Sequence, residues 1–119
     1  MVVETVFQAL KVIMQPYVNK LECKIDTPTH LYLETSYLQN KPLFFGAVQI
    51  KRNYVSFHLM SIYTDPDLLA STSAELKAAM QGKSCFNFKT VNPALFEQLT
   101  ALTKASFESY RQNGYIAPN

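Results

Sequence analysis

The chain of 119 residues has the length of one domain, residues 1–119, and its formal net charge is only +2. A domain of this size buries roughly two thirds of the surface that its unfolded chain exposes, so it needs neither disulfides nor structural metal. The three glycines, Gly46, Gly82 and Gly114, lie far apart, which excludes the glycine-rich phosphate loops of Rossmann and P-loop folds.

The charge pattern and the cysteines limit the compartment and the partners. The longest basic run is Lys51-Arg52, which excludes a dedicated nucleic-acid binder. The sequence contains no apolar run long enough to span a bilayer, and its N-terminus lacks the basic leader of a secretory signal. Cys23 and Cys85 are distant in sequence, so we expect reduced thiols, with a disulfide as the alternative. The sequence predicts a cytoplasmic protein without nucleic-acid or membrane partners.

The spacing of the apolar residues changes within the first half of the chain. Apolar residues from Val3 to Leu21 recur every three or four positions, which predicts an amphipathic helix over residues 2–20. Pro16 predicts that this helix kinks or ends just before it. From Glu22 the period is two, which predicts four strands. They are expected at residues 22–25, 31–36, 43–50 and 54–62, and their short connections favour an antiparallel meander.

The segment after these strands contains one short helix and one further strand. Thr72 and Glu75 have the spacing of a capping box, which predicts a helix through Met80 that ends at Gly82. Alternation over residues 84–89 then predicts a fifth strand.

The last predicted element is a helix after residue 91. Asn92 is a favourable cap, Pro93 suits the first helical position, and Asn113-Gly114 ends the helix. The predicted order is α-β-β-β-β-α-β-α. This order indicates a two-layer α+β fold, an antiparallel sheet of about five strands with the N- and C-terminal helices on one face.

One face of this sheet is expected to lie open, with a mixture of polar and aromatic side chains. In the strand at 54–62, Val55, Phe57 and Leu59 should face the helices, so the alternating residues face outward. The predicted outer set is Glu22, Lys24, Tyr32, Glu34, Phe45, Gln49, Tyr54, Ser56, His58, Met60, Cys85, Asn87 and Lys89. Such a surface is typical of a binding or dimer interface, and the alternative is an ordinary solvated face.

Two pairs of side chains raise the question of catalysis. Ser56 and His58 share a predicted face, and Cys85 would join His58 if the fifth strand lay beside the fourth. Neither pair has an orienting acid or an oxyanion hole nearby in sequence. A non-enzymatic role is therefore favoured, with a small enzyme that has a Cys/His or Lys-centred site as an alternative, and no catalytic residue is assigned.

Metal and anion sites are not indicated by spacing. The candidate ligands Cys23, Asp26, His30, His58, Asp65, Asp67 and Cys85 form no metal-binding motif. The run Gln81-Gly82-Lys83-Ser84 imitates the end of a P-loop but follows a helix instead of opening one. Lys51, Arg52, Lys77, Lys83 and Lys89 could gather to hold an anion or simply form a solvated basic face.

Two segments carry a family resemblance. Residues 51–63, KRNYVSFHLMSIY, and residues 80–89, MQGKSCFNFK, resemble the central strand and the later helix-turn-strand of the YdhG-like family of small bacterial domains of unknown function. The resemblance implies a single YdhG-like domain with a fold similar in outline to that of frataxin. It also singles out Lys83 in the family-like turn.

The resemblance further suggests a frataxin-like iron or metal chaperone. Such chaperones hold iron on clustered acids, whereas the first helix and strand here offer only Glu4, Glu22 and Asp26 beside lysines. We therefore expect no cofactor, with iron as the alternative. The leading hypothesis is a binding or interaction domain that uses its open sheet face for homodimerisation, a small molecule or a protein. The predicted ligand-binding residues are Tyr54, Ser56, His58, Lys83, Cys85 and Asn87.

Overall fold

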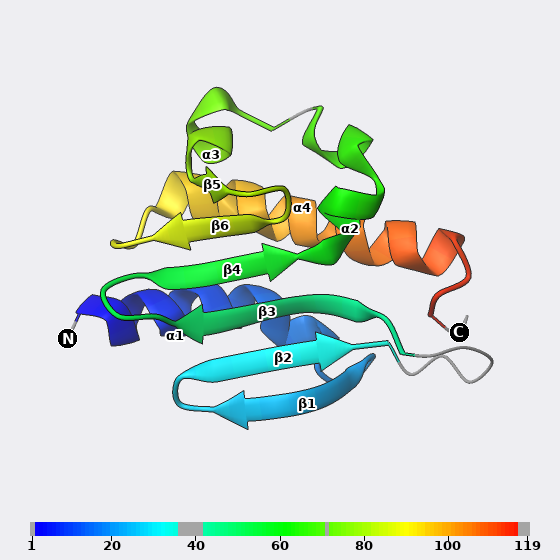
Figure 1. The fold of residues 1–119 in the computed structure, drawn as a ribbon, viewed down its shortest axis with the longest axis horizontal. Helices are drawn as coiled ribbons and strands as arrows, with labels where there is room; N and C mark the ends of the chain where they lie inside the picture. Colours follow the sequence, from blue (N-terminus) through cyan, green and yellow to red (C-terminus); the bar gives the residue numbers. More distant parts are fainter. Residues whose placement is uncertain (1, 36–41, 71, 117–119) are drawn as a thin grey trace.

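Six strands form one antiparallel sheet in the computed structural model, which describes residues 2–35, 42–70 and 72–116. Their spatial order is β1-β2-β3-β4-β6-β5 (Figure 1). The strands are β1 (Glu22–Thr27), β2 (His30–Glu34), β3 (Phe44–Ile50), β4 (Val55–Leu59), β5 (Met80–Gln81) and β6 (Cys85–Phe88). The predicted meander of the first four strands is confirmed, and β6 pairs with β4.

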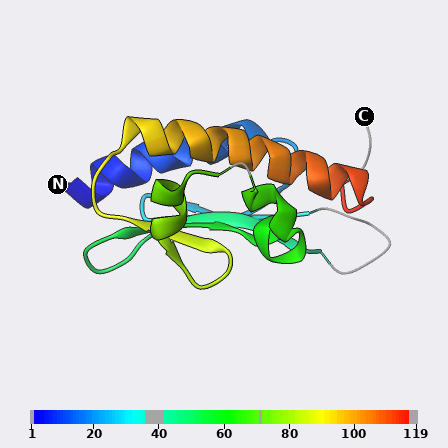
Figure 2. The same cartoon turned by 90° about the horizontal axis from the view of Figure 1, so that it is seen from above.

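Two long helices cover the same face of this sheet (Figure 2). They are α1 (Val2–Met14) and α4 (Pro93–Gln112). Helix α1 stops short of the predicted residue 20 because Pro16 interrupts its hydrogen bonding, and the 3-10 turn η1 (Gln15–Tyr17) follows. The predicted α+β fold, with helices at both ends of the chain on one sheet face, is confirmed.

Helix α4 begins where its sequence signals predict. The Asn92 side chain accepts a hydrogen bond from the Leu95 N–H at 3.1 Å, and Pro93 occupies the first helical position. This cap satisfies a backbone donor that the helix itself leaves unpaired.

The segment after β4 differs from the prediction. β4 ends at Leu59 rather than Ile62, and helix α2 (Met60–Thr64) and the 3-10 turn η2 (Pro66–Leu69) follow. Ser61 and Ile62 are buried within α2. A short apolar run such as residues 60–62 can be buried either as the end of a strand or as a one-turn helix. The spacing of its apolar residues therefore does not distinguish the two.

The predicted helix through Met80 is shorter and is followed by an additional strand. Helix α3 (Ala74–Ala78) takes its cap from Ser73, whose side chain accepts from the Leu76 N–H, rather than from Thr72. Met80 already belongs to β5, which pairs with β6. Gly82, with φ of 79°, therefore forms the turn of the β5–β6 hairpin and does not end a helix.

The core lies between the sheet and the two long helices. Val55, Phe57 and Leu59 of β4 are fully buried, as predicted. Gly46 of β3 is required here, because a Cβ on it would lie 2.6 Å from Met14 Cε and 2.7 Å from the His58 carbonyl oxygen. The missing side chain lets α1 pack closely on β3 behind the open face.

A bulge in β3 overturns the predicted orientation of Phe45. Glu34 pairs with Phe44 and Leu33 pairs with Gly46, so Phe45 is an extra residue with no partner on β2. Phe45 was predicted to face outward, but it is fully buried among rings of the helix layer. Phe44 takes its place on the open face, because one inserted residue inverts the alternation.

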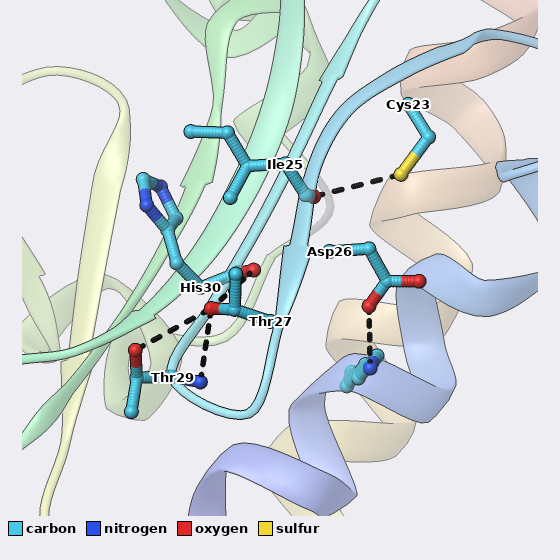
Figure 3. Close-up of polar contacts among 7 residues, drawn as sticks. Cys23, Ile25, Asp26, Thr27, Thr29 and His30 are labelled. Carbon is cyan, nitrogen blue, oxygen red and sulfur yellow. Dashed lines mark hydrogen bonds and ion pairs between the residues drawn. The ribbon is translucent and has the colours of Figure 1, made fainter.

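A second bulge interrupts the alternation of side chains in β1. Cys23 pairs with Leu33 and Ile25 pairs with Tyr32, which leaves Lys24 as the extra residue. Figure 3 shows Ile25 and His30 on one side of the hairpin. The Cys23 and Asp26 side chains point to the other side, where Asp26 forms an ion pair with Lys11 of α1 at 2.8 Å.

Candidate functional site

Four rings form a continuous row across the open face. Tyr32 of β2 stacks on Phe44 of β3, with 4.7 Å between the ring centroids and 24° between the planes. His30 meets Tyr32 edge-on at 6.1 Å, and His58 of β4 meets Phe44 edge-on at 5.1 Å. We call these four side chains the aromatic row. It exists because the β3 bulge brings Phe44 onto the face that carries Tyr32 and His58.

The aromatic row borders an open pocket of about 480 Å³. Side chains of β2, β3, β4, β5 and β6, together with residues of the β3–β4 turn, form its wall. The lining residues are His30, Tyr32, Phe44, Ala47, Gln49, Lys51, Tyr54, Ser56, His58, Gln81, Cys85 and Asn87. We call it the open-face pocket. Figure 2 shows the β3–β4 and β5–β6 turns projecting on this side of the sheet, away from α1 and α4.

The structure brings five of the six predicted site residues together here, namely Tyr54, Ser56, His58, Cys85 and Asn87. Strand pairing explains this, since His58 lies opposite Cys85 and Ser56 lies opposite Asn87. The sixth, Lys83, lies elsewhere. Its ammonium lies 5.8 Å from the Tyr63 ring centroid, beside a separate hollow of about 680 Å³.

The His58 imidazole is held by a residue that the sequence did not point to. Its Nε2 lies 2.7 Å from Oγ of Ser84, a buried residue at the end of the β5–β6 turn. Burial lowers the pKa of His58 below its usual 6.5, and the positive charge of Lys51 lowers it further. The pKa of His30 is lowered by the same two causes. Both imidazoles are therefore neutral at pH 7.

The Cys85 thiol lies beside His58 but is not activated by it. Its Sγ donates toward Oδ1 of Asn87 at 3.6 Å. Burial raises the pKa of Cys85 above the ordinary thiol value, and this effect exceeds the opposing ones of Lys51, Phe57 and Ser56. The raised pKa keeps the Cys85 thiol protonated at neutral pH, whereas a nucleophilic cysteine typically has a lowered pKa.

The two cysteines and the acids do not converge on a metal-binding geometry. Within residues 2–35, 42–70 and 72–116, no three His, Cys, Asp or Glu side chains gather as a group that could hold a metal ion. Both cysteines are free thiols. Asp26, one of the candidate ligands, is instead paired with Lys11.

The sequence missed Phe44, Ser84 and the pocket position of Lys51, each for a different reason. Phe44 was hidden by the bulge, which leaves no signal in the residue pattern. Ser84 was assigned to the fifth strand but lies just before it. Lys51 was noted only as one of several scattered cations, although continued alternation from Ala47 and Gln49 places it on the open face.

Comparisons with known proteins add no assignment. No protein-family model, no curated protein and no solved structure matches this chain. The resemblance to the YdhG-like family therefore stays a prediction. In the part of the chain that the structure describes, no helix is both long enough and apolar enough to cross a bilayer.

Proposed function

We propose that this domain is a non-enzymatic binding module whose open-face pocket takes a small planar molecule. The observation that carries the proposal is the aromatic row at the edge of a pocket of about 480 Å³. Small-molecule sites typically measure roughly 300–1,000 Å³ and combine apolar walls with a few polar groups. We expect it to act in the cytoplasm, as its composition indicates.

The row supports a planar ligand because its rings are already aligned. The Tyr32–Phe44 stack is half-buried and fixed on two strands that pair with each other. A flat ring placed on it gains aromatic contact of about 0.5–1.5 kcal/mol beyond the burial of area. Little side-chain freedom remains to be lost on binding, since the strands and neighbouring rings already restrict these side chains.

The polar lining supports orientation rather than reaction. Ser56 of β4 lies between two partners, Asn87 on β6 and Gln49 on β3, and all three line the pocket. Their hydroxyl and amide groups can donate and accept hydrogen bonds. The protonated Cys85 and neutral His58 do not form an activated pair, so the alternative of a Cys/His enzyme has less support. The iron-chaperone alternative has less support as well, because the described residues hold no acidic or mixed ligand cluster.

Homodimerisation through this face has less support than a small ligand. Among the described residues, the exposed large apolar side chains are Val2, Val12, Leu43, Tyr63 and Val91. None of them lines the open-face pocket. Stable homodimer interfaces are more apolar than the general surface, so the mixed lining favours a small molecule.

The proposal can be tested by NMR on the full chain with two planar probes, 2-naphthoate and its neutral isostere 2-naphthamide. Binding should shift the backbone amides of β2, β3, β4 and β6. Tyr32→Ala should weaken the binding of either probe about tenfold, because it removes half of the stack. The matched control Tyr63→Ala, a tyrosine that is 57% exposed and outside the pocket, should leave both affinities unchanged. Shifts confined to the helices, or none at millimolar probe, would refute the function.

A further inference from the structure

The charge inside the open-face pocket is unbalanced. Among the described residues that line it, Lys51 is the one cation and none is a carboxylate. Both lining histidines are neutral at pH 7, because burial and Lys51 lower their pKa values. The described lining therefore carries one positive charge and no carboxylate. Glu34, an acid that acts on the aromatic row, lies outside the lining, opposite Phe44, and burial together with this acid raises the pKa of Tyr32.

The position of Lys51 is fixed by the β3–β4 turn. It follows directly on Ile50, the last residue of β3, and its backbone N–H donates to the Tyr54 carbonyl oxygen at 2.8 Å. Its side chain is exposed, and no ion pair involving it is formed among the described residues. The turn thus presents a free ammonium group at the mouth of the pocket.

The field of this ammonium reaches three strands. Lys51 lowers the pKa values of His30 on β2, His58 on β4 and Cys85 on β6. Lys51 also lines the same pocket as Tyr32, Phe44 and His58, so an anionic group paired with its ammonium would lie in the pocket that the aromatic row borders.

We infer that the ligand of the open-face pocket is a planar molecule with an anionic group, which pairs with Lys51 while its ring stacks on Tyr32 and Phe44. This inference rests on the proposed function and names the class of ligand. The neutral donors beside it, Ser56, Gln49 and Asn87, can complete the hydrogen bonds of a carboxylate or a phosphate. A neutral planar molecule would gain the stacking contact but no ion pair with Lys51.

The test compares 2-naphthoate with 2-naphthamide on the wild-type chain and on Lys51→Gln, with affinities from calorimetry. The wild type should prefer the carboxylate about two- to fivefold, which corresponds to one ion pair with an exposed ammonium. Lys51→Gln should abolish that preference, so that the two probes bind equally, and Lys51→Arg should restore it. The matched control Lys83→Gln removes an exposed lysine from the neighbouring turn, outside the pocket, and should keep the preference.

The outcomes separate the two proposals. Equal affinity of the wild type for both probes, or a preference that survives Lys51→Gln, overturns the anionic ligand and leaves the binding function standing. Failure of both probes to bind the open face overturns the function and the inference together. Rising salt should reduce only the carboxylate preference, since ionic strength screens exposed charges; a salt-insensitive preference also counts against the inference.

Discussion

The environment of His58 favours a neutral imidazole at pH 7. The imidazole lies against Phe44, hydrogen-bonds Ser84 and faces Cys85 across the strand pair, with Lys51 as the nearby charge. All of these neighbours favour its neutral form or are indifferent to it. A neutral imidazole offers one donor and one acceptor, which suits hydrogen bonding to a ligand.

Acidification should therefore destabilise the fold. The pKa of His58 is lowered in the native state, so the unfolded chain binds a proton more readily. The stability contributed by the neutral ring is complete above the unfolded value of 6.5 and is lost as pH falls from 6.5 through the folded pKa. NMR titration of the ring protons should give a His58 pKa below 6.5, and the melting temperature should fall between pH 7 and pH 5.

His58→Gln should reduce that pH dependence, while the remainder belongs to His30, whose pKa is shifted in the same direction. A His58 pKa above 6.5, or a melting temperature that rises on acidification, would contradict this account.

At the scale of elements, the sequence predicts most of the fold and about half of the site. The amphipathic periods, the Asn92 cap and the short connections are local signals, and the structure confirms the helices at both ends and the meander that they predict. Alternation in β4 and β6 correctly places Ser56, His58 and Asn87 on the open face. These strands contain no register shift.

The remainder could not be predicted because it depends on pairing between strands. The bulges at Lys24 and Phe45 are set by the register with β2, and nothing in the residues on either side marks them. An alternation pattern predicts the correct sheet face for a side chain only up to the first inserted residue, because the insertion exchanges the two faces. For this reason the sequence placed Phe45 where Phe44 lies, and the aromatic row was not foreseen.

The packing of α1 on β3 gives a prediction at this scale. Gly46→Ala should destabilise the protein by roughly 1–3 kcal/mol, because the added Cβ would meet both Met14 Cε and the backbone oxygen of His58. Met14 can move but the β4 backbone cannot, so Met14→Ala should not restore stability. Urea denaturation measures the loss, and a change below about 0.5 kcal/mol would show that the two layers are looser than described.

At the scale of the whole molecule, a hydrogen bond joins the helix layer to the strand that carries Phe44 on the open face. The Tyr110 hydroxyl near the end of α4 donates to the Phe44 carbonyl oxygen at 2.6 Å. Phe44 is the first residue of β3 and the centre of the aromatic row. Burial raises the pKa of Tyr110 to about 12, so the hydroxyl remains a donor throughout the neutral range.

Tyr110→Phe should cost about 1 kcal/mol of stability and should shift the NMR signals of Phe44 and Tyr32 on the far side of the sheet. The control Tyr115→Phe alters the ring that packs edge-on against Tyr110 at 5.3 Å and should leave the aromatic row undisturbed. Equal spectral changes in the two variants would show that the hydroxyl does not hold Phe44 in place.

The bulge at Lys24 has one more consequence, which concerns the margins of the sheet. β1 is one edge of the sheet, and β5, only two residues long, is the other. An exposed edge strand is a template on which a further strand can add and aggregation can begin. The bulge breaks the regular spacing of free backbone groups along β1 and sets a lysine in their midst, while β5 is too short to serve as a template. Both margins therefore offer a further strand few regularly spaced backbone groups to pair with, although the sheet face beside them is open.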